Sequence, residues 1–174
     1  MGYDLESKAF PALSEDEQQN LLGRIMRNAV SRFPFDPIKA IQAMWDGYAE
    51  TGRYFRFNIV AFPKLVELAE RHGWRPAKRL FPDADDFRYV GCGEVSAEDA
   101  RSFADALERA LDALNDVEPM QPPYGETEVI PGTGIMGIGP RGDLSPEAFW
   151  SGRAAKEKIR RFIQFARHGA FTIS

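Results

Sequence analysis

The chain has 174 residues, of which 44% are hydrophobic and 28% are charged, and its formal net charge is −4. This composition is ordinary for a globular protein able to bury a substantial core, and it excludes wholesale disorder. The negative charge disfavours a general nucleic-acid binder, because such proteins draw on a basic surface.

The first predicted helix has a clear start and a clear end. Ser14 and Glu17 have the spacing of a capping box, in which each side chain satisfies a free backbone N–H at the helix start. Pro34 ends the helix. Apolar residues recur at helical spacing between these points, so one buried stripe is expected from Leu21, Leu22, Ile25, Met26, Ala29 and Val30.

A second helix should follow at once. Asp36 and Pro37 suit the N-cap and the first helical position, where the missing proline N–H is not needed, and Gly52 ends the helix. Its expected apolar face consists of Ile38, Ile41, Met44, Trp45 and Tyr48.

After the second helix, the spacing of apolar residues changes from that of a helix to that of a strand. Residues 53–60 alternate aromatic with polar side chains, which is typical of a half-buried strand. A helix is expected from Pro63 to a glycine C-cap at Gly73. The stretch from Arg79 to Gly93 is ambiguous, with a short strand after the acidic turn 82–86 as one reading.

The most regular predicted helix covers residues 96–114, capped by Ser96 with Asp99 in a box-like position. Residues 115–146 contain six prolines and six glycines and are expected to form a long ordered loop, with a short strand at 127–130. A last helix is expected over 153–168, followed by a terminal strand at 171–173. The predicted fold is α+β: one mostly helical domain spanning residues 1–174, with a small antiparallel sheet.

Charge is distributed unevenly along the chain. Residues 83–118 hold eleven acidic residues against three arginines, and residues 153–167 hold six basic residues against Glu157. The simplest interpretation is that the two segments face each other or are each solvated. Alternatively, the basic stripe of Lys156, Arg160 and Arg167 binds phosphate, an acidic protein or nucleic acid.

No motif carries a complete chemistry. Residues 132–137 read G-x-G-x-x-G, but Pro131 precedes them and Gly139-Pro140 stands where a nucleotide-binding helix would start. The acidic residues 83–86 lack the glycine and closing glutamate of an EF-hand. Carboxylates of the 96–114 helix lie opposite its apolar face, as on an ordinary solvated surface.

The single cysteine, Cys92, excludes an intrachain disulfide, and neither His72 nor His168 is near it in sequence. It reads best as a small apolar residue in a turn. The sequence therefore nominates no catalytic, cofactor-binding or metal-binding residue, and the balance is against an enzyme. Residues 1–10 do not have the pattern of a secretory signal, and no apolar run approaches 18 residues. A cytoplasmic protein is expected.

Four segments together resemble a group of small uncharacterised bacterial proteins. The resemblance covers roughly residues 50–115 and 155–174, and it departs from the expected pattern at Gly91-Cys92-Gly93, where a polar turn would be typical. It implies a bacterial origin and no catalytic residue, since those proteins have no established activity. The segments read Tyr-Phe-Arg-Phe-Asn at 54–58, His-Gly-Trp at 72–74, Ser-Ala-Glu-Asp-Ala at 96–100, and Arg-Phe-Ile-Gln-Phe-Ala-Arg-His-Gly-Ala-Phe at 161–171.

Two main functional hypotheses follow, and a homo-oligomeric scaffold is a third. In the first, the chain is a non-catalytic protein-binding module, with toxin-neutralising immunity proteins as an analogue in size and charge, and the acidic 83–118 region steers a basic partner. In the second, the 115–146 loop covers a small-molecule pocket or an active site, where Arg53, Arg56 or Tyr124 orients the ligand.

Overall fold

The computed structural model describes residues 2–58, 60–77, 80, 93–117, 124–129, 136–140 and 145–174. The fold is α+β, as the sequence predicts, with helices dominating a small antiparallel sheet. The elements in chain order are β1 (Gly2–Ser7), α1 (Glu15–Arg32), α2 (Pro37–Glu50), β2 (Tyr54–Asn58), α3 (Ala61–Arg71), β3 (Gly93–Val95), α4 (Ala97–Ala113), β4 (Tyr124–Val129), β5 (Met136–Pro140), α5 (Pro146–Phe149), α6 (Arg153–Arg167) and β6 (Phe171–Ile173).

The main sheet has the strand order β2-β1-β6-β3, and each neighbouring pair is antiparallel. One of its two inner strands, β1, is missing from the sequence prediction, although Tyr3 and Leu5 alternate with Asp4 and Glu6 in the pattern of a half-buried strand. This strand pairs with β2 across some fifty residues of chain, with Tyr3 opposite Phe57. The terminal strand expected at 171–173 is present as β6.

The predicted helix starts are confirmed where a capping side chain marks them. Ser14 accepts from the Glu17 backbone N–H while Glu17 reaches back to Ser14, so the capping box is complete. Asp36 and Ser96 cap α2 and α4. These bonds join residues three positions apart, so the local sequence is enough to predict them.

Helix α3 begins two residues earlier than predicted. The Asn58 side-chain oxygen accepts hydrogen bonds from the backbone N–H groups of Val60 and Ala61, at 3.1 and 2.7 Å. These bonds satisfy donors at the helix start, and Pro63 is tolerated inside the first turn because its missing N–H has no partner there.

The core lies between the sheet and the helices α3, α4 and α6. Phe162 of α6 is fully buried at its centre, and its ring lies 5.2 Å from that of Phe103 on α4 and 5.3 Å from that of Phe57 on β2. Trp74 stacks on Phe103 with 4.1 Å between ring centroids, and its indole N–H donates to the Asp99 carbonyl. Eight of the 13 phenylalanines lie in this aromatic core.

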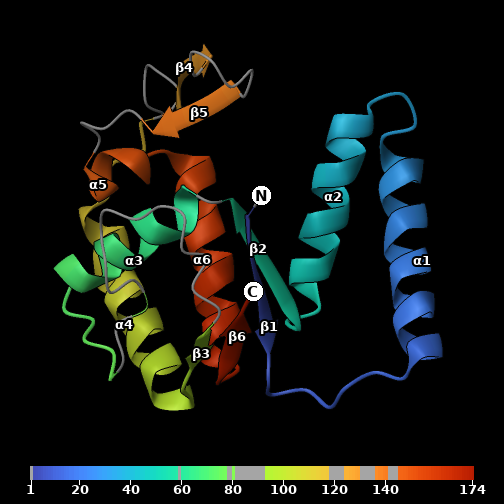
Figure 1. Ribbon diagram of the computed structural model, residues 1–174, viewed down its shortest axis with the longest axis horizontal. Coiled ribbons are helices and arrows are strands. Elements are labelled where there is room, and N and C mark those ends of the chain that lie inside the picture. Colours follow the sequence, from blue (N-terminus) through green and yellow to red (C-terminus); the bar gives the residue numbers. More distant parts are fainter. Residues whose placement is uncertain are drawn as a thin grey trace.

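Figure 1 shows the layers: α1 and α2 stand together on one side of strands β1 and β2, and α3, α4 and α6 stand on the other. Helix α1 packs on α2, and α2 packs on β2. We call α1, α2 and the loop between them the helical hairpin. No helix in the described part of the chain is long and apolar enough to cross a membrane.

The predicted long loop at 115–146 contains regular structure. Strands β4 and β5 form a two-stranded antiparallel sheet within it, with Thr127 opposite Ile138 and an irregular register between Tyr124 and Thr127. The strand expected at 127–130 is thus longer and starts earlier. The ambiguous stretch 79–93 falls mainly outside the described residues, and only Gly93 enters a strand, β3.

Candidate functional site

The helical hairpin exposes five large apolar side chains, which we call the hairpin patch. Met26 and Val30 on α1 are 50% and 55% exposed, and Ile38 and Ile41 on α2 are 79% and 54% exposed. Phe35, in the loop that joins the helices, is 97% exposed. Monomeric proteins rarely leave apolar side chains of this size uncovered together, so the patch is a candidate binding surface.

The patch corrects the sequence prediction. Met26, Val30, Ile38 and Ile41 were expected on buried faces, and the structure buries only their neighbours Ile25, Ala29 and Ala40 on these two helices. The helical period identifies an apolar face, but the face is wider than the contact between two helices. Tertiary packing decides whether the rest of the apolar face is covered. Here the body of the molecule does not cover it, so these side chains stay exposed.

The loop end of the hairpin carries positive charge, although the hairpin as a whole, residues 15–50, has six acidic and four basic residues. Between residues 20 and 42 there are four basic residues and one acidic residue, Asp36. Asp36 is bound to Lys39 at 3.2 Å and caps α2, so it neutralises only one of the four. Arg24 and Arg32 line a cavity between the two helices. The basic residues next to the hairpin patch are therefore Arg27, which follows Met26, and Lys39, which follows Ile38, and we call these two the basic rim.

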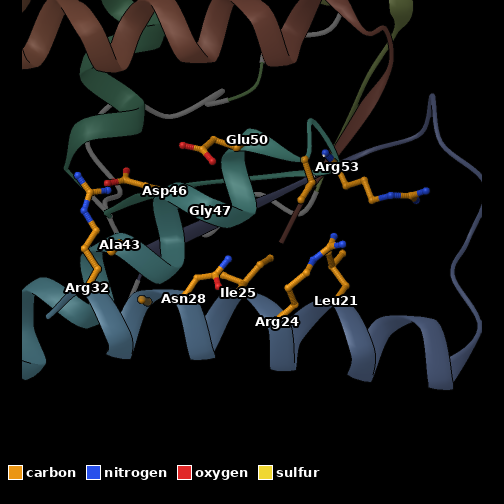
Figure 2. A pocket seen from close by; sticks show the side chains of 12 residues that line it. Leu21, Arg24, Ile25, Asn28, Arg32, Ala43, Asp46, Gly47, Glu50 and Arg53 are labelled. Atoms are coloured by element: carbon orange, nitrogen blue, oxygen red, sulfur yellow. Dashed lines mark hydrogen bonds between the residues drawn. The ribbon is translucent and has the colours of Figure 1, made fainter. Parts of the chain in front are cut away.

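The opposite side of the hairpin is polar and hollow. A cavity of about 630 Å³ lies between α1 and α2 and is lined by Arg24 and Asn28 of α1 and by Asp46 and Glu50 of α2. In Figure 2, Arg32 extends across the cavity toward Asp46. Because successive helical residues are rotated by about 100°, Met26, Val30 and Ile41 lie on the side of the hairpin away from this cavity.

An aromatic joint attaches the hairpin to the sheet. Trp45 of α2 stacks on Tyr54 of β2 at 5.8 Å between ring centroids, and the Arg56 guanidinium lies 4.5 Å from the Trp45 ring centroid. The Tyr54 hydroxyl donates to Asp4, which also pairs with Arg56 at 3.5 Å. Burial and the Asp4 hydrogen bond raise the pKa of Tyr54, so its hydroxyl stays protonated and remains a donor.

A second pocket, of about 340 Å³, lies between α2 and α6. Its wall includes Phe55 and Arg56, which are on opposite faces of β2, so the pocket lies along the edge of that strand. Arg161 of α6 crosses this edge to Asp46 of α2 at 3.0 Å. We call this space the α2–α6 pocket. Lys158 of α6 also lines it.

The acidic and basic segments do face each other, as the simplest interpretation of the sequence predicts. Arg167 of α6 pairs with Asp105 and Glu108 of α4 at 3.3 and 2.7 Å, and Lys156 pairs with Asp116 at 2.6 Å. The hydrogen bond from Lys156 lowers the pKa of Asp116. These pairs neutralise part of the surface that was expected to steer a basic partner.

The other sequence candidates are not brought together. Cys92 and the acidic turn 83–86 lie outside the described residues. Of the G-x-G-x-x-G run at 132–137, only Met136 and Gly137 are described, at the start of β5. His72 ends α3, whereas His168 ends α6 and contacts the Phe10 ring at 5.2 Å. Within the described ranges, no group of His, Cys, Asp and Glu side chains has the geometry of a metal site.

The proposed ligand-orienting residues have internal partners. Arg53 donates to the Pro11 carbonyl at 2.8 Å and lies over the Phe10 ring, and Arg56 is held by Asp4 and Trp45. Tyr124 begins β4. The small-molecule pocket expected beneath residues 115–146 involves chain outside the described residues, so that expectation stays a prediction.

Sequence reasoning missed Lys158 and the exposure of Phe35. Lys158 appears in the sequence as one of six cations in a basic helix, and nothing local distinguishes it from its neighbours. Phe35 had a usable signal, because it stands between Pro34 and the Asp36 N-cap, where the chain turns and an aromatic side chain has few neighbours to pack on.

Comparison with protein-family models, curated proteins and solved structures finds no match to this chain. The resemblance to small bacterial proteins and the bacterial origin that it implies therefore stay predictions.

Proposed function

We propose that the protein is a non-catalytic binding module that holds another protein through the hairpin patch. The observation that carries this proposal is the exposure of Met26, Val30, Phe35, Ile38 and Ile41 on one projecting element. Covering such side chains removes apolar surface from water, which is the main favourable term in protein association.

The body of the protein supports the same interpretation. Its core residues are tightly buried, whereas the five large apolar side chains of the hairpin patch are exposed. This contrast supports a binding surface on the hairpin.

The basic rim indicates the chemistry of the partner. Arg27 extends the positive charge alongside the patch, and Lys39 adds to it at the start of α2. A partner with an apolar groove and acidic residues around it would match both features. A second copy docked patch to patch would bring two basic rims together, which opposes self-association. A toxin-neutralising role and a cytoplasmic location stay predictions from size, charge and composition.

Site-specific photo-crosslinking tests this proposal. A photoreactive benzoyl-phenylalanine replaces Phe35 in the patch and, as a matched control, Asn20 on the exposed polar part of α1. In extracts of the source organism, the Phe35 position should yield one discrete adduct with a different protein, and the Asn20 position should not. An adduct with the chain itself, with lipid only, or with nothing would contradict the proposal.

The identified partner then allows a quantitative check. The double substitution Ile38→Ser, Ile41→Ser should weaken binding by about tenfold or more, because anchoring apolar side chains dominate interface energies. Thermal stability should stay unchanged, since both side chains are exposed. Arg27→Glu should mainly slow association, and the slowing should diminish at high salt.

A further inference from the structure

The α2–α6 pocket lies on an unpaired strand edge. Asp4 of β1 exchanges both of its backbone hydrogen bonds with Ser174, on the β6 side, at 2.9 Å each. Asp4 stands opposite Arg56 in the β1–β2 register, and β2 is the last strand of its sheet. Since both backbone groups of Asp4 point toward β6, Asp4 and Arg56 form a non-hydrogen-bonded pair of the β1–β2 ladder. The backbone N–H and C=O of Arg56 therefore point away from β1, along the edge of β2 where the pocket lies.

Among the described residues, one of the cations that line the pocket has no carboxylate at salt-bridge distance. Arg161 holds Asp46 at 3.0 Å and Glu157 at 3.7 Å, and Arg56 is paired with Asp4. The Lys158 ammonium forms no salt bridge within the described residues. It lies 4.9 Å from the centroid of the Phe57 ring, at the boundary of the core.

This position is unfavourable for an isolated charge. Burial lowers the pKa of Lys158, and the more distant Asp46 carboxylate offsets this only in part. The contact with Phe57 contributes some cation–π attraction. An anion beside the amine would restore the interaction that the ammonium loses on leaving water.

The remaining walls are suited to an apolar body. Trp45 and Phe55 supply aromatic surface, and Ala49 and Ala154 leave room beside them. The cavity volume of about 340 Å³ is that of a small organic molecule or of one to two amino-acid residues.

We propose that the α2–α6 pocket binds a monocarboxylate with an aromatic body, whose carboxylate pairs with Lys158 and whose ring lies against Trp45 and Phe55. Two sources share this chemistry: a free aromatic acid, and the C-terminal carboxylate of a peptide that ends in an aromatic residue. The site uses none of the five residues of the hairpin patch, so it stands or fails independently of the proposed protein-binding function.

Four probes test the proposal: phenylacetate, N-acetyl-glycyl-phenylalanine, and the neutral amide of each. Binding is followed by calorimetry and by the NMR signals of the Arg56 amide and the Trp45 indole. Each acid should bind about tenfold or more tightly than its own amide, as expected for a charge-assisted hydrogen bond. Tighter binding of phenylacetate identifies a small acid as the ligand class, and tighter binding of the peptide identifies C-terminal recognition.

Lys158→Met should abolish the preference for acid over amide, and Lys158→Gln is a second variant if the first disturbs folding. Arg160→Met is the matched control, because it removes a neighbouring cation of α6 that does not line the pocket. Equal binding of acid and amide, no saturable binding of any probe, or an intact acid preference in a folded Lys158→Met protein would overturn the proposal.

Discussion

Arg161 of α6 and Asp46 of α2 form a salt bridge of 3.0 Å that connects the helical hairpin to the body across the free edge of β2. Both side chains are 41% exposed, so the bridge itself contributes at most about 1 kcal/mol to global stability. Its position matters more than its energy, because it spans the α2–α6 pocket.

Asp46→Asn should therefore loosen the hairpin more than it destabilises the fold. The substitution removes the charge that Arg161 contacts, while the aromatic joint of Trp45 and Tyr54 remains. Amide hydrogen exchange in α1 and α2 should become faster, and the denaturation midpoint should change little. Glu157→Gln is the control, because it disturbs contacts within α6 only. Equal acceleration of exchange in both variants would contradict the assignment.

Phe162→Ala should cost about 3–5 kcal/mol in the free energy of unfolding, because it empties the centre of the aromatic core. Phe35→Ala removes the same group from a position that is 97% exposed, and it should change stability by less than about 0.5 kcal/mol. Denaturant unfolding of both variants measures the difference. Similar losses for the two would show that Phe35 is covered in the free protein.

Two helical glycines should respond differently to alanine. At Gly23 an added Cβ would meet only the flexible end of Arg27 at 3.2 Å, so Gly23→Ala should stabilise the protein by about 0.5–1 kcal/mol through helix propensity. At Gly47 the Cβ would lie 3.0 Å from Cγ2 of Ile25, which is buried between α1 and α2. Gly47→Ala should therefore be less stable than Gly23→Ala, with the loss located in the hairpin.

The hairpin should also be sensitive to acid. Hydrogen bonds from the Ser14 backbone and side chain lower the pKa of Glu17, and the Lys39 backbone N–H lowers that of Asp36. Because both carboxyl groups have lower pKa values when folded, their contribution is fully present above the unfolded values of about 4.5 and 3.8. It is lost as the pH falls through the folded values.

Helix content and exchange rates of α1 and α2, followed from pH 7 downward, measure this loss. The variant Ser14→Ala, Asp36→Ala removes both N-cap side chains, so its hairpin should be weaker at neutral pH and less dependent on pH below it. The same acid dependence in the variant as in the wild type would show that other carboxyl groups are responsible.

The order of the helices and their starting points follow from the sequence because the deciding interactions are local. Ser14 with Glu17, Asp36 with Lys39, and Ser96 with Asp99 are each three residues apart. Alternation over β2 likewise identifies a strand with one buried face. These patterns are sufficient for the α+β fold class.

The candidate sites depend on distant partners, so they could not be predicted in the same way. Ile25 and Met26 both belong to the apolar stripe of α1, and nothing in the sequence indicates that Ile25 is buried and Met26 exposed. Only the packing of the helices distinguishes the two residues. Likewise, β1 reaches β2 across some fifty residues, and β2 then becomes an edge strand because no further strand follows it in the sheet.

The sequence by itself determined where the helices begin, which residues alternate, and that an aromatic core would form. The tertiary structure decided that α1 and α2 project from the body and that their outer apolar residues stay exposed. It also decided that Lys158 lines a pocket and has no salt-bridge partner among the described residues. The physical reason is the distance along the chain over which each interaction acts. Capping and helical periodicity involve residues within one or two turns of a helix, whereas burial and charge pairing depend on which distant elements come into contact.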